Sequence, residues 1–160
     1  MFEILDTVCT PTKGTEFSGS VDLYAREDTL IPVGAVTHVP LGVIIDLDKL
    51  RDTLQSLYGK SVELETWWHT YLKTHFLELK CRSSFPGKYN LLVANDVGEI
   101  DIDCPDELCL IIYNPYMPGK KATVIKKEAK IAQIRLMKHD TMMMRIETTV
   151  KRSGSIGSTG

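Results

Sequence analysis

The stretch of sequence that decides the fold runs from residue 95 to residue 103 and reads Asn95-Asp96-Val97-Gly98-Glu99-Ile100-Asp101-Ile102-Asp103. Apolar and polar residues alternate from Val93 onward, and a cluster of Asn, Asp and Gly interrupts that alternation. The alternation predicts β-strands, and the cluster predicts the tight, polar tip of a β-hairpin. Considered alone, the stretch is explained more simply as an ordinary acidic hairpin turn that binds nothing.

The same stretch also carries groups that suit a flat polar ligand. Gly98 has no Cβ, so the backbone around it can approach such a ligand closely. The Asn95 side chain offers one acceptor and two donors, which is enough to contact the edge of an amide-like base. Asp101 follows three residues after Gly98 and can face the same space. A carboxylate placed there can take a proton from water, so Asp101 is the candidate general base.

Around this stretch, many short apolar segments are separated by Gly and Pro turns. This pattern predicts an all-β sandwich or barrel. Loops are expected at 12–20 and 114–119, a turn is expected at 81–87, and Met142 to Met144 are expected to fill packing space. The predicted strands cover residues 2–8, 21–25, 30–33, 35–47 with a break near Pro40, 76–80, 91–94, 108–113, 122–125 and 130–137.

One segment, at about residues 48–74, departs from the β pattern. Leu47, Leu50, Leu54 and Leu57 recur at helical spacing, and Gly59 is a plausible stop. Ser61 is a plausible N-cap for a second helix, whose apolar stripe is Leu64, Trp67 or Trp68, Tyr71 and Leu72. A helical pair is therefore expected inside the β chain, with its tryptophans acting as core anchors rather than stacking on a ligand.

Length, charge and cysteine content narrow the possible classes of protein. At 160 residues the chain is long enough for one domain, placed at 1–150 and followed by a flexible Gly/Ser-rich tail at 151–160. The net charge of −2 argues against general nucleic-acid binding. We expect no membrane span and no signal peptide. The spacing of Cys9, Cys81, Cys104 and Cys109 predicts reduced thiols, which fits a cytoplasmic protein.

Several polar clusters suit one kind of ligand, a polyphosphate. Arg82 can pair with phosphate oxygens, and the adjacent Ser83 and Ser84 can donate hydroxyl hydrogen bonds. Gln133 places an amide among apolar residues, and the tail after Arg152 offers many backbone N–H groups. The tail lacks the Gly-Lys-Ser/Thr ending of a P-loop. Each cluster is weak alone, since Arg82 also suits a surface salt bridge and the tail also suits a linker.

Taken in order along the chain, these clusters resemble the five motifs of the trimeric dUTPase family. The resemblance covers nearly the whole chain apart from the helical insertion. The matching segments are Gly19-Ser20-Val21-Asp22-Leu23-Tyr24-Ala25, then Arg82-Ser83-Ser84, then the stretch at 95–103, then Lys130-Ile131-Ala132-Gln133, and finally Arg152-Ser153-Gly154-Ser155-Ile156-Gly157-Ser158-Thr159-Gly160.

The resemblance implies a distorted jelly-roll β-barrel or sandwich that works as a homotrimer, with active sites between subunits. It implies hydrolysis of dUTP to dUMP and pyrophosphate, with Mg²⁺ held mainly by the triphosphate and not directly by the protein. Asp101 would be the general base, and Asp22 would support the site indirectly. The other implied contacts are Asn95, Gly98 and Ile100 with the base, Arg82, Ser83, Ser84 and Gln133 with the phosphates, and Arg152, Ser158 and Thr159 in the closing arm.

Two positions depart from the family pattern, and both touch the base–sugar end of the site. Cys104 stands where the family usually has a tyrosine under the deoxyribose, and Ile156 stands where it has a phenylalanine over the base. An isoleucine cannot stack, which removes a contribution of about 1 kcal/mol. We therefore expect looser or altered nucleoside selectivity.

Three alternatives to a strict dUTPase follow from these features. The first is a hydrolase of the same fold acting on another pyrimidine nucleotide. The second is a dCTP deaminase, which Asp101 and the Gly-Ser-Thr-Gly terminus argue against. The third is a nucleotide-sensing regulatory protein that binds a partner protein through the helical insertion. The insertion precedes Arg82, where family members usually pass directly between strands. Its apolar stripe predicts that it packs either on its own barrel or on a neighbouring subunit.

Overall fold

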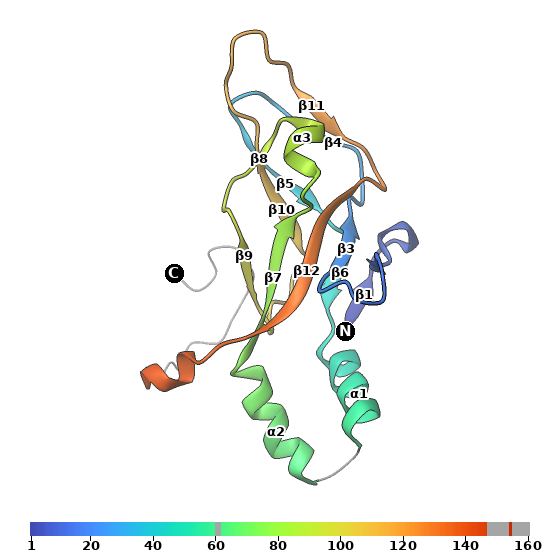
Figure 1. Ribbon diagram of the computed structural model, residues 1–160, viewed down its shortest axis with the longest axis vertical. Coiled ribbons are helices and arrows are strands. Elements are labelled where there is room, and N and C mark those ends of the chain that lie inside the picture. The colour runs from blue at the N-terminus through green and yellow to red at the C-terminus, as the bar shows by residue number, and fades with distance from the viewer. Residues whose placement is uncertain (60–61, 147–153, 155–160) are drawn as a thin grey trace.

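The computed structural model shows a β-sandwich from which two helices project at one end (Figure 1). It describes residues 1–59, 62–146 and 154. The helices are α1 (Leu47–Tyr58), α2 (Val62–Leu72) and α3 (Phe85–Tyr89), with short 3-10 helices η1 (Thr7–Cys9) and η2 (Thr141–Met144). The strands are β1 (Phe2–Ile4), β2 (Thr12–Lys13), β3 (Val21–Tyr24), β4 (Thr29–Ile31), β5 (Val36–Pro40), β6 (Val43–Ile45), β7 (His75–Cys81), β8 (Leu92–Val93), β9 (Gly98–Asp101), β10 (Cys109–Tyr113), β11 (Thr123–Ile125) and β12 (Lys130–Lys138).

The strands pair antiparallel throughout the described residues. The largest sheet has the order β2-β3-β12-β7-β9, and a second sheet has the order β5-β10-β8. Two small ribbons, β1-β6 and β11-β4, complete the sandwich. Strands that are distant in sequence thus lie side by side, as in a jelly roll. This arrangement confirms the all-β fold with a helical insertion that the sequence predicts.

Alternation along the strands places the main core between the sheets. Leu77 and Leu79 of β7 are buried, and Glu78 between them is only half-buried. On β12, Ile131, Ala132 and Ile134 are buried, and the pairing with β3 is irregular between Lys130 and Ala132. Phe85 of α3 is buried in the same core. Each such side chain contributes about 1.5–3 kcal/mol of burial free energy, so this core holds the outward-facing residues in register.

The helical pair forms as the sequence predicts, and α1 and α2 are called the helical hairpin below. Asp46 caps α1 by accepting a hydrogen bond from the Lys49 backbone N–H at 2.9 Å. Gly59 ends it with a φ of 83°, which a residue with a side chain rarely adopts. Trp68 is buried as a core anchor, but Leu57, predicted to be in the stripe, is 70 % exposed. The predicted cap at Ser61 and the side chain of Leu64 lie outside the described residues.

The predicted β-hairpin at residues 95–103 is wrong. β8 pairs with β10, whereas β9 pairs with β7 in the other sheet. The turn between β8 and β9 therefore carries the chain from one sheet to the other, and β9 does not fold back against β8. Asp96, with a φ of 57°, lies in the left-handed region that redirects the backbone there. A local alternation pattern cannot distinguish these two paths, because both need a tight polar turn.

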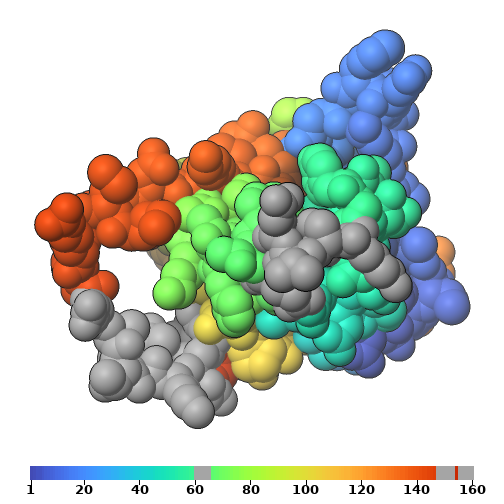
Figure 2. All heavy atoms as spheres, turned by 90° about the horizontal axis from the view of Figure 1, so that it is seen from below, coloured from blue at the N-terminus to red at the C-terminus, as the bar shows by residue number. Residues whose placement is uncertain are grey.

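Three smaller expectations also differ from the structure. The strand predicted at 2–8 ends at Ile4 and is followed by η1, because Asp6 accepts a hydrogen bond from the Val8 backbone N–H at 3.2 Å. The expected turn at 81–87 contains the start of α3. Met142 to Met144 do not fill the core of this protomer: Met143 is 76 % exposed. The η2 helix that carries them lies away from the sandwich and the helical hairpin (Figures 1 and 2).

The four cysteines form no disulfide bond in the structure. All four cysteines are free, in agreement with the predicted reduced thiols. Burial raises the pKa of Cys109 to about 11, so this thiol is a poor nucleophile at neutral pH. None of the helices in the described part of the chain has the length and apolar character needed to cross a bilayer.

Candidate active site

The predicted phosphate-binding residues gather around a nearly buried carboxylate, that of Asp22. This side chain belongs to a residue only 8 % exposed. Arg82 approaches it with Nε 3.0 Å from Oδ1, and Lys130 approaches it with Nζ 3.2 Å from Oδ2. The hydrogen bond to Asp22 also raises the pKa of Lys130. Asp22 thus holds two cations at one place on the sheet, which fits the supporting role that the resemblance implies.

Sheet register explains why these residues meet. Asp22 on β3 is directly opposite Gln133 on β12, which in turn is opposite Lys80 on β7. Arg82 follows the end of β7, and its backbone N–H donates to the carbonyl of Ile131 at 3.0 Å. Segments that are far apart in sequence therefore present Asp22, Arg82 and Gln133 on the outward face of one sheet.

Ser83 and Ser84 lie next to this group, at the start of α3. Both are exposed, whereas the following Phe85 is buried in the main core. The Phe85 backbone N–H donates to the Arg82 carbonyl at 2.9 Å, which closes the turn over the two serines. The two serines are consequently held at the surface directly after Arg82 in the chain, where a ligand that approaches this face can reach them.

The predicted base-binding residues form a second group on and around β9. Gly98 is buried, and a Cβ at this position would lie 3.4 Å from the Leu79 carbonyl oxygen and 3.6 Å from Asn95 Nδ2. The Asn95 amide thus lies beside the Gly98 backbone, where an added Cβ would make ordinary van der Waals contact with its neighbours. Ile100 is half-buried, and Asp101 is exposed at the end of the strand. Cys104, three residues further, is buried in the main core.

The two groups lie at different places on the same sheet within one protomer. Asp101 pairs with Phe76 on β7, whereas Gln133 pairs with Lys80, four residues further along that strand. With two strand spacings between β9 and β12, the positions are about 16 Å apart. One protomer therefore does not bring its own Asp101 next to its own phosphate-binding group.

An ion cluster that the sequence analysis did not identify lies between the two groups. Glu78 on β7 accepts hydrogen bonds from Lys80 Nζ at 2.9 Å and from Arg135 Nε and Nη2 at 2.8 and 3.2 Å. The hydrogen bonds from Arg135 and then Lys80 lower the pKa of Glu78. Alternation in the two strands would have placed all three side chains outward, but their pairing depends on a register that sequence alone did not give.

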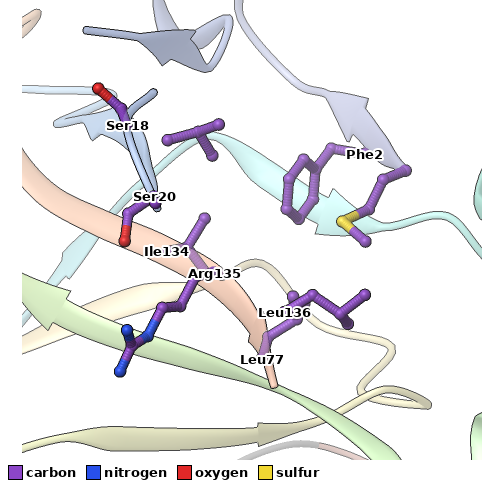
Figure 3. Close-up of a pocket in the computed structure, with 10 residues that line it drawn as sticks. Phe2, Ser18, Ser20, Leu77, Ile134, Arg135 and Leu136 are labelled. Atoms are coloured by element: carbon purple, nitrogen blue, oxygen red, sulfur yellow. The ribbon is translucent and has the colours of Figure 1, made fainter. Parts of the chain in front are cut away.

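A hollow of about 340 Å³ lies on the opposite, inward side of the same sheet. It is lined mainly by apolar side chains, with Phe2, Leu77 and Leu136 at one end and Ser18 and Ser20 at the other (Figure 3). Neither Asp101 nor the Asp22 group lines it. The hollow is thus separate from the predicted site residues. The remaining predicted contacts, Arg152, Ile156, Ser158 and Thr159, lie outside the described residues.

No family model matches the chain, but curated proteins resemble it over most of its length. The deoxyuridine 5'-triphosphate nucleotidohydrolase of Rickettsia canadensis is 28% identical over 156 residues, which cover 94% of this chain and 87% of the relative. The protein of the same name from Rickettsia typhi gives the same identity and coverage.

Solved structures give the same result for the fold. The dUTPase from Streptococcus mutans matches with a TM-score of 0.63 and 23% identity, covering 87% of this chain and 95% of that one. A mutant dUTPase from phage phi11 of S. aureus, described with a structural Mg(II) ion, matches with a TM-score of 0.62 and 13% identity, covering 99% and 98%. Together these likenesses confirm the resemblance to dUTPases that the motifs predict.

Proposed function

Given this resemblance to dUTPases in sequence and fold, we propose that the chain is a dUTP diphosphatase that hydrolyses dUTP to dUMP and pyrophosphate. The observation that carries the proposal is the arrangement on β9. Asn95 lies beside the buried Gly98, and the exposed Asp101 ends the same strand. A base held at Gly98 would place the α-phosphate of its nucleotide toward Asp101.

Asp101 would act on the attacking water. Its carboxylate orients the water in line with the bond to be broken and accepts the proton as the oxygen bonds to the α-phosphorus. The bond from that phosphorus to the bridging oxygen breaks, and pyrophosphate leaves with the electron pair. Arg82, Ser83, Ser84 and Gln133 would hold the phosphate oxygens through charge-assisted hydrogen bonds.

Mg²⁺ fits this arrangement as an ion held by the substrate. Among the described residues, no three His, Cys, Asp or Glu side chains gather into a ligand set. Mg²⁺ commonly takes most of its ligands from substrate phosphates and water, and it would supply charge neutralisation for the leaving pyrophosphate. The protein's part is to hold the phosphate chain beside the Asp22 group.

We also propose that the active form is a homotrimer, in the cytoplasm. The separation of about 16 Å between the β9 group and the phosphate-binding group supports sites assembled from more than one subunit. Asp101 of one subunit would then face Arg82 and Gln133 of a neighbour. The arm carrying Arg152, Ile156, Ser158 and Thr159 would close over the nucleotide.

A partner protein at the helical hairpin is a further part of the proposal. Leu57 and Tyr58 are exposed near the end of α1, and Trp67 is partly exposed on α2, where its ring lies 5.9 Å from that of Tyr58. Exposed aromatic side chains of this kind are typical of interaction surfaces. If the chain were a nucleotide sensor and not an enzyme, it would bind dUTP without releasing pyrophosphate.

The substitution Asp101→Asn tests the proposed function. It keeps the size of the side chain but removes the base, so kcat should fall by about 1,000-fold or more while dUTP affinity is retained. The measurement is pyrophosphate release with Mg²⁺, together with a direct binding titration. Asp52→Asn, on the exposed side of α1, is the matched control and should leave kcat unchanged. Full activity in the Asp101→Asn protein would contradict the proposal.

A further inference from the structure

The side chain that follows Asp101 in the chain is buried, and the proposed reaction gives no reason for its burial. Ile102 lies between the exposed Asp101 and Asp103, yet it is only 4 % exposed. It does not belong to the main core between the sheets. It belongs to a second core, in which the other buried members among the described residues all come from the helical hairpin: Leu50, Leu54, Trp68 and Tyr71.

The backbone around Ile102 is fixed from two sides. The Cys104 N–H donates to the Asp101 carbonyl at 3.0 Å, which closes a turn that we call the acidic turn (residues 101–104). Cys104 is buried in the main core, while Ile102 is buried in the second core. The acidic turn is therefore anchored to two separate cores, while its two acidic residues, Asp101 and Asp103, are exposed.

The helical hairpin is also joined closely to the strand that pairs with β9. α2 ends at Leu72 and β7 begins at His75. Across this junction, Thr74 Oγ1 donates to the Thr70 carbonyl at 2.8 Å, and the rings of Tyr71 and His75 stack with centroids 3.9 Å apart. The next residue of β7, Phe76, pairs directly with Asp101. The hairpin thus reaches Asp101 through the β7 backbone as well as through Ile102.

We infer that Ile102 is a positioning residue and that the helical hairpin is a brace that sets the position of the Asp101 carboxylate. The inference rests on the proposed function, since it assigns Asp101 the role of general base. In-line attack needs the base and the water in a narrow range of positions, and a displacement of about 1 Å can cost about 100-fold in rate. A hydrophobic anchor immediately beside the base limits such displacements.

The substitution Ile102→Ala tests this inference by leaving a cavity between the acidic turn and the helical hairpin. The kcat for dUTP should fall by about 10- to 100-fold, while KM changes by no more than about 3-fold, because the groups that bind the nucleotide are untouched. Ile102→Val, which removes a single methyl group and leaves a smaller cavity, should lower kcat by a smaller factor, about 2- to 5-fold. The Cys104 amide should exchange with deuterium faster in the alanine variant, since its hydrogen bond closes the turn.

Leu57→Ala is the matched control, because it removes the same amount of apolar side chain from the exposed surface of the hairpin. It should leave both kcat and the exchange of the Cys104 amide unchanged. Wild-type kcat in Ile102→Ala, or an equal loss in Leu57→Ala, would overturn the inference.

Two other outcomes are also decisive. Should the alanine variant not fold, Ile102→Val is measured alone, and an unchanged kcat together with unchanged exchange at Cys104 overturns the inference. A wild-type protein that releases no pyrophosphate from dUTP would overturn the proposed function instead. The exchange measurement needs no substrate, so it would still report whether Ile102 holds the acidic turn.

Discussion

At the scale of single residues, the proposed site keeps the residues expected to bind phosphates but lacks the aromatic residue expected at the sugar. The Asp22 carboxylate pairs with Arg82 Nε at 3.0 Å and with Lys130 Nζ at 3.2 Å. The two cations are therefore held in place without a ligand. At the other end, Cys104 is buried in the main core and offers no ring to a deoxyribose. In the proposed site, the departures from the dUTPase motifs therefore lie at the base–sugar end and not at the phosphates.

Nucleoside selectivity is expected to be looser than in relatives that carry tyrosine at this position. Without a ring under the deoxyribose, less surface is available to exclude a 2′-hydroxyl, and UTP should become a detectable substrate. The measurement compares kcat/KM for dUTP, UTP, dTTP and dCTP. Cys104→Tyr tests the cause and should reduce the rate with UTP relative to dUTP, unless the larger ring disturbs the core, which a melting curve would reveal. A strict preference for dUTP in the unaltered protein would reject the prediction.

At the scale of elements, the sequence was informative where the pattern was local. Helical spacing of leucines and the glycine stop identified α1, and short apolar segments identified β7, β10 and β12. The path of the chain around Asp96 was not predictable, because a β-hairpin and a crossing between sheets need the same turn residues. Ile102 was missed for a related reason: its burial depends on a helical hairpin that packs against it from elsewhere in the chain.

The Glu78 cluster that joins β7 to β12 predicts a pH-dependent contribution to stability. Because Arg135 and Lys80 lower the pKa of Glu78 in the folded state, the contribution is present above the unfolded-state pKa of about 4.3. It is lost as pH falls through the lower, folded-state pKa. Glu78→Gln should therefore reduce the free energy of unfolding by about 1 kcal/mol at pH 7, and the difference from wild type should vanish in acid.

Urea unfolding at a series of pH values between 7 and the acid limit of the native state measures this difference. Arg135→Gln completes a double-mutant cycle, because its loss should make the Glu78→Gln substitution less costly at pH 7. A difference that stays constant down to the lowest pH would contradict the assigned role of the cluster.

At the scale of the whole molecule, each proposed active site combines residues of more than one subunit. In one protomer the β9 group and the Asp22 group occupy different places on the outward face of the sheet. The features that remain unpaired in one copy, including the exposed Met142 to Met144 on η2, also fit a chain that works in an assembly. The separation of the two groups could not be predicted from local sequence patterns, because it depends on how the strands pair. Shared sites were expected only from the resemblance to trimeric dUTPases.

Mixing two inactive variants tests this claim most directly. Asp101→Asn lacks the proposed base, and Arg82→Ala lacks a phosphate contact, so each should be nearly inactive alone. Co-expressed in equal amounts and assembled at random, they should recover about a quarter of wild-type activity, since some sites would combine an intact Asp101 from one subunit with an intact Arg82 from another. A mixed assembly no more active than either variant alone, while the wild type hydrolyses dUTP, would contradict a shared active site.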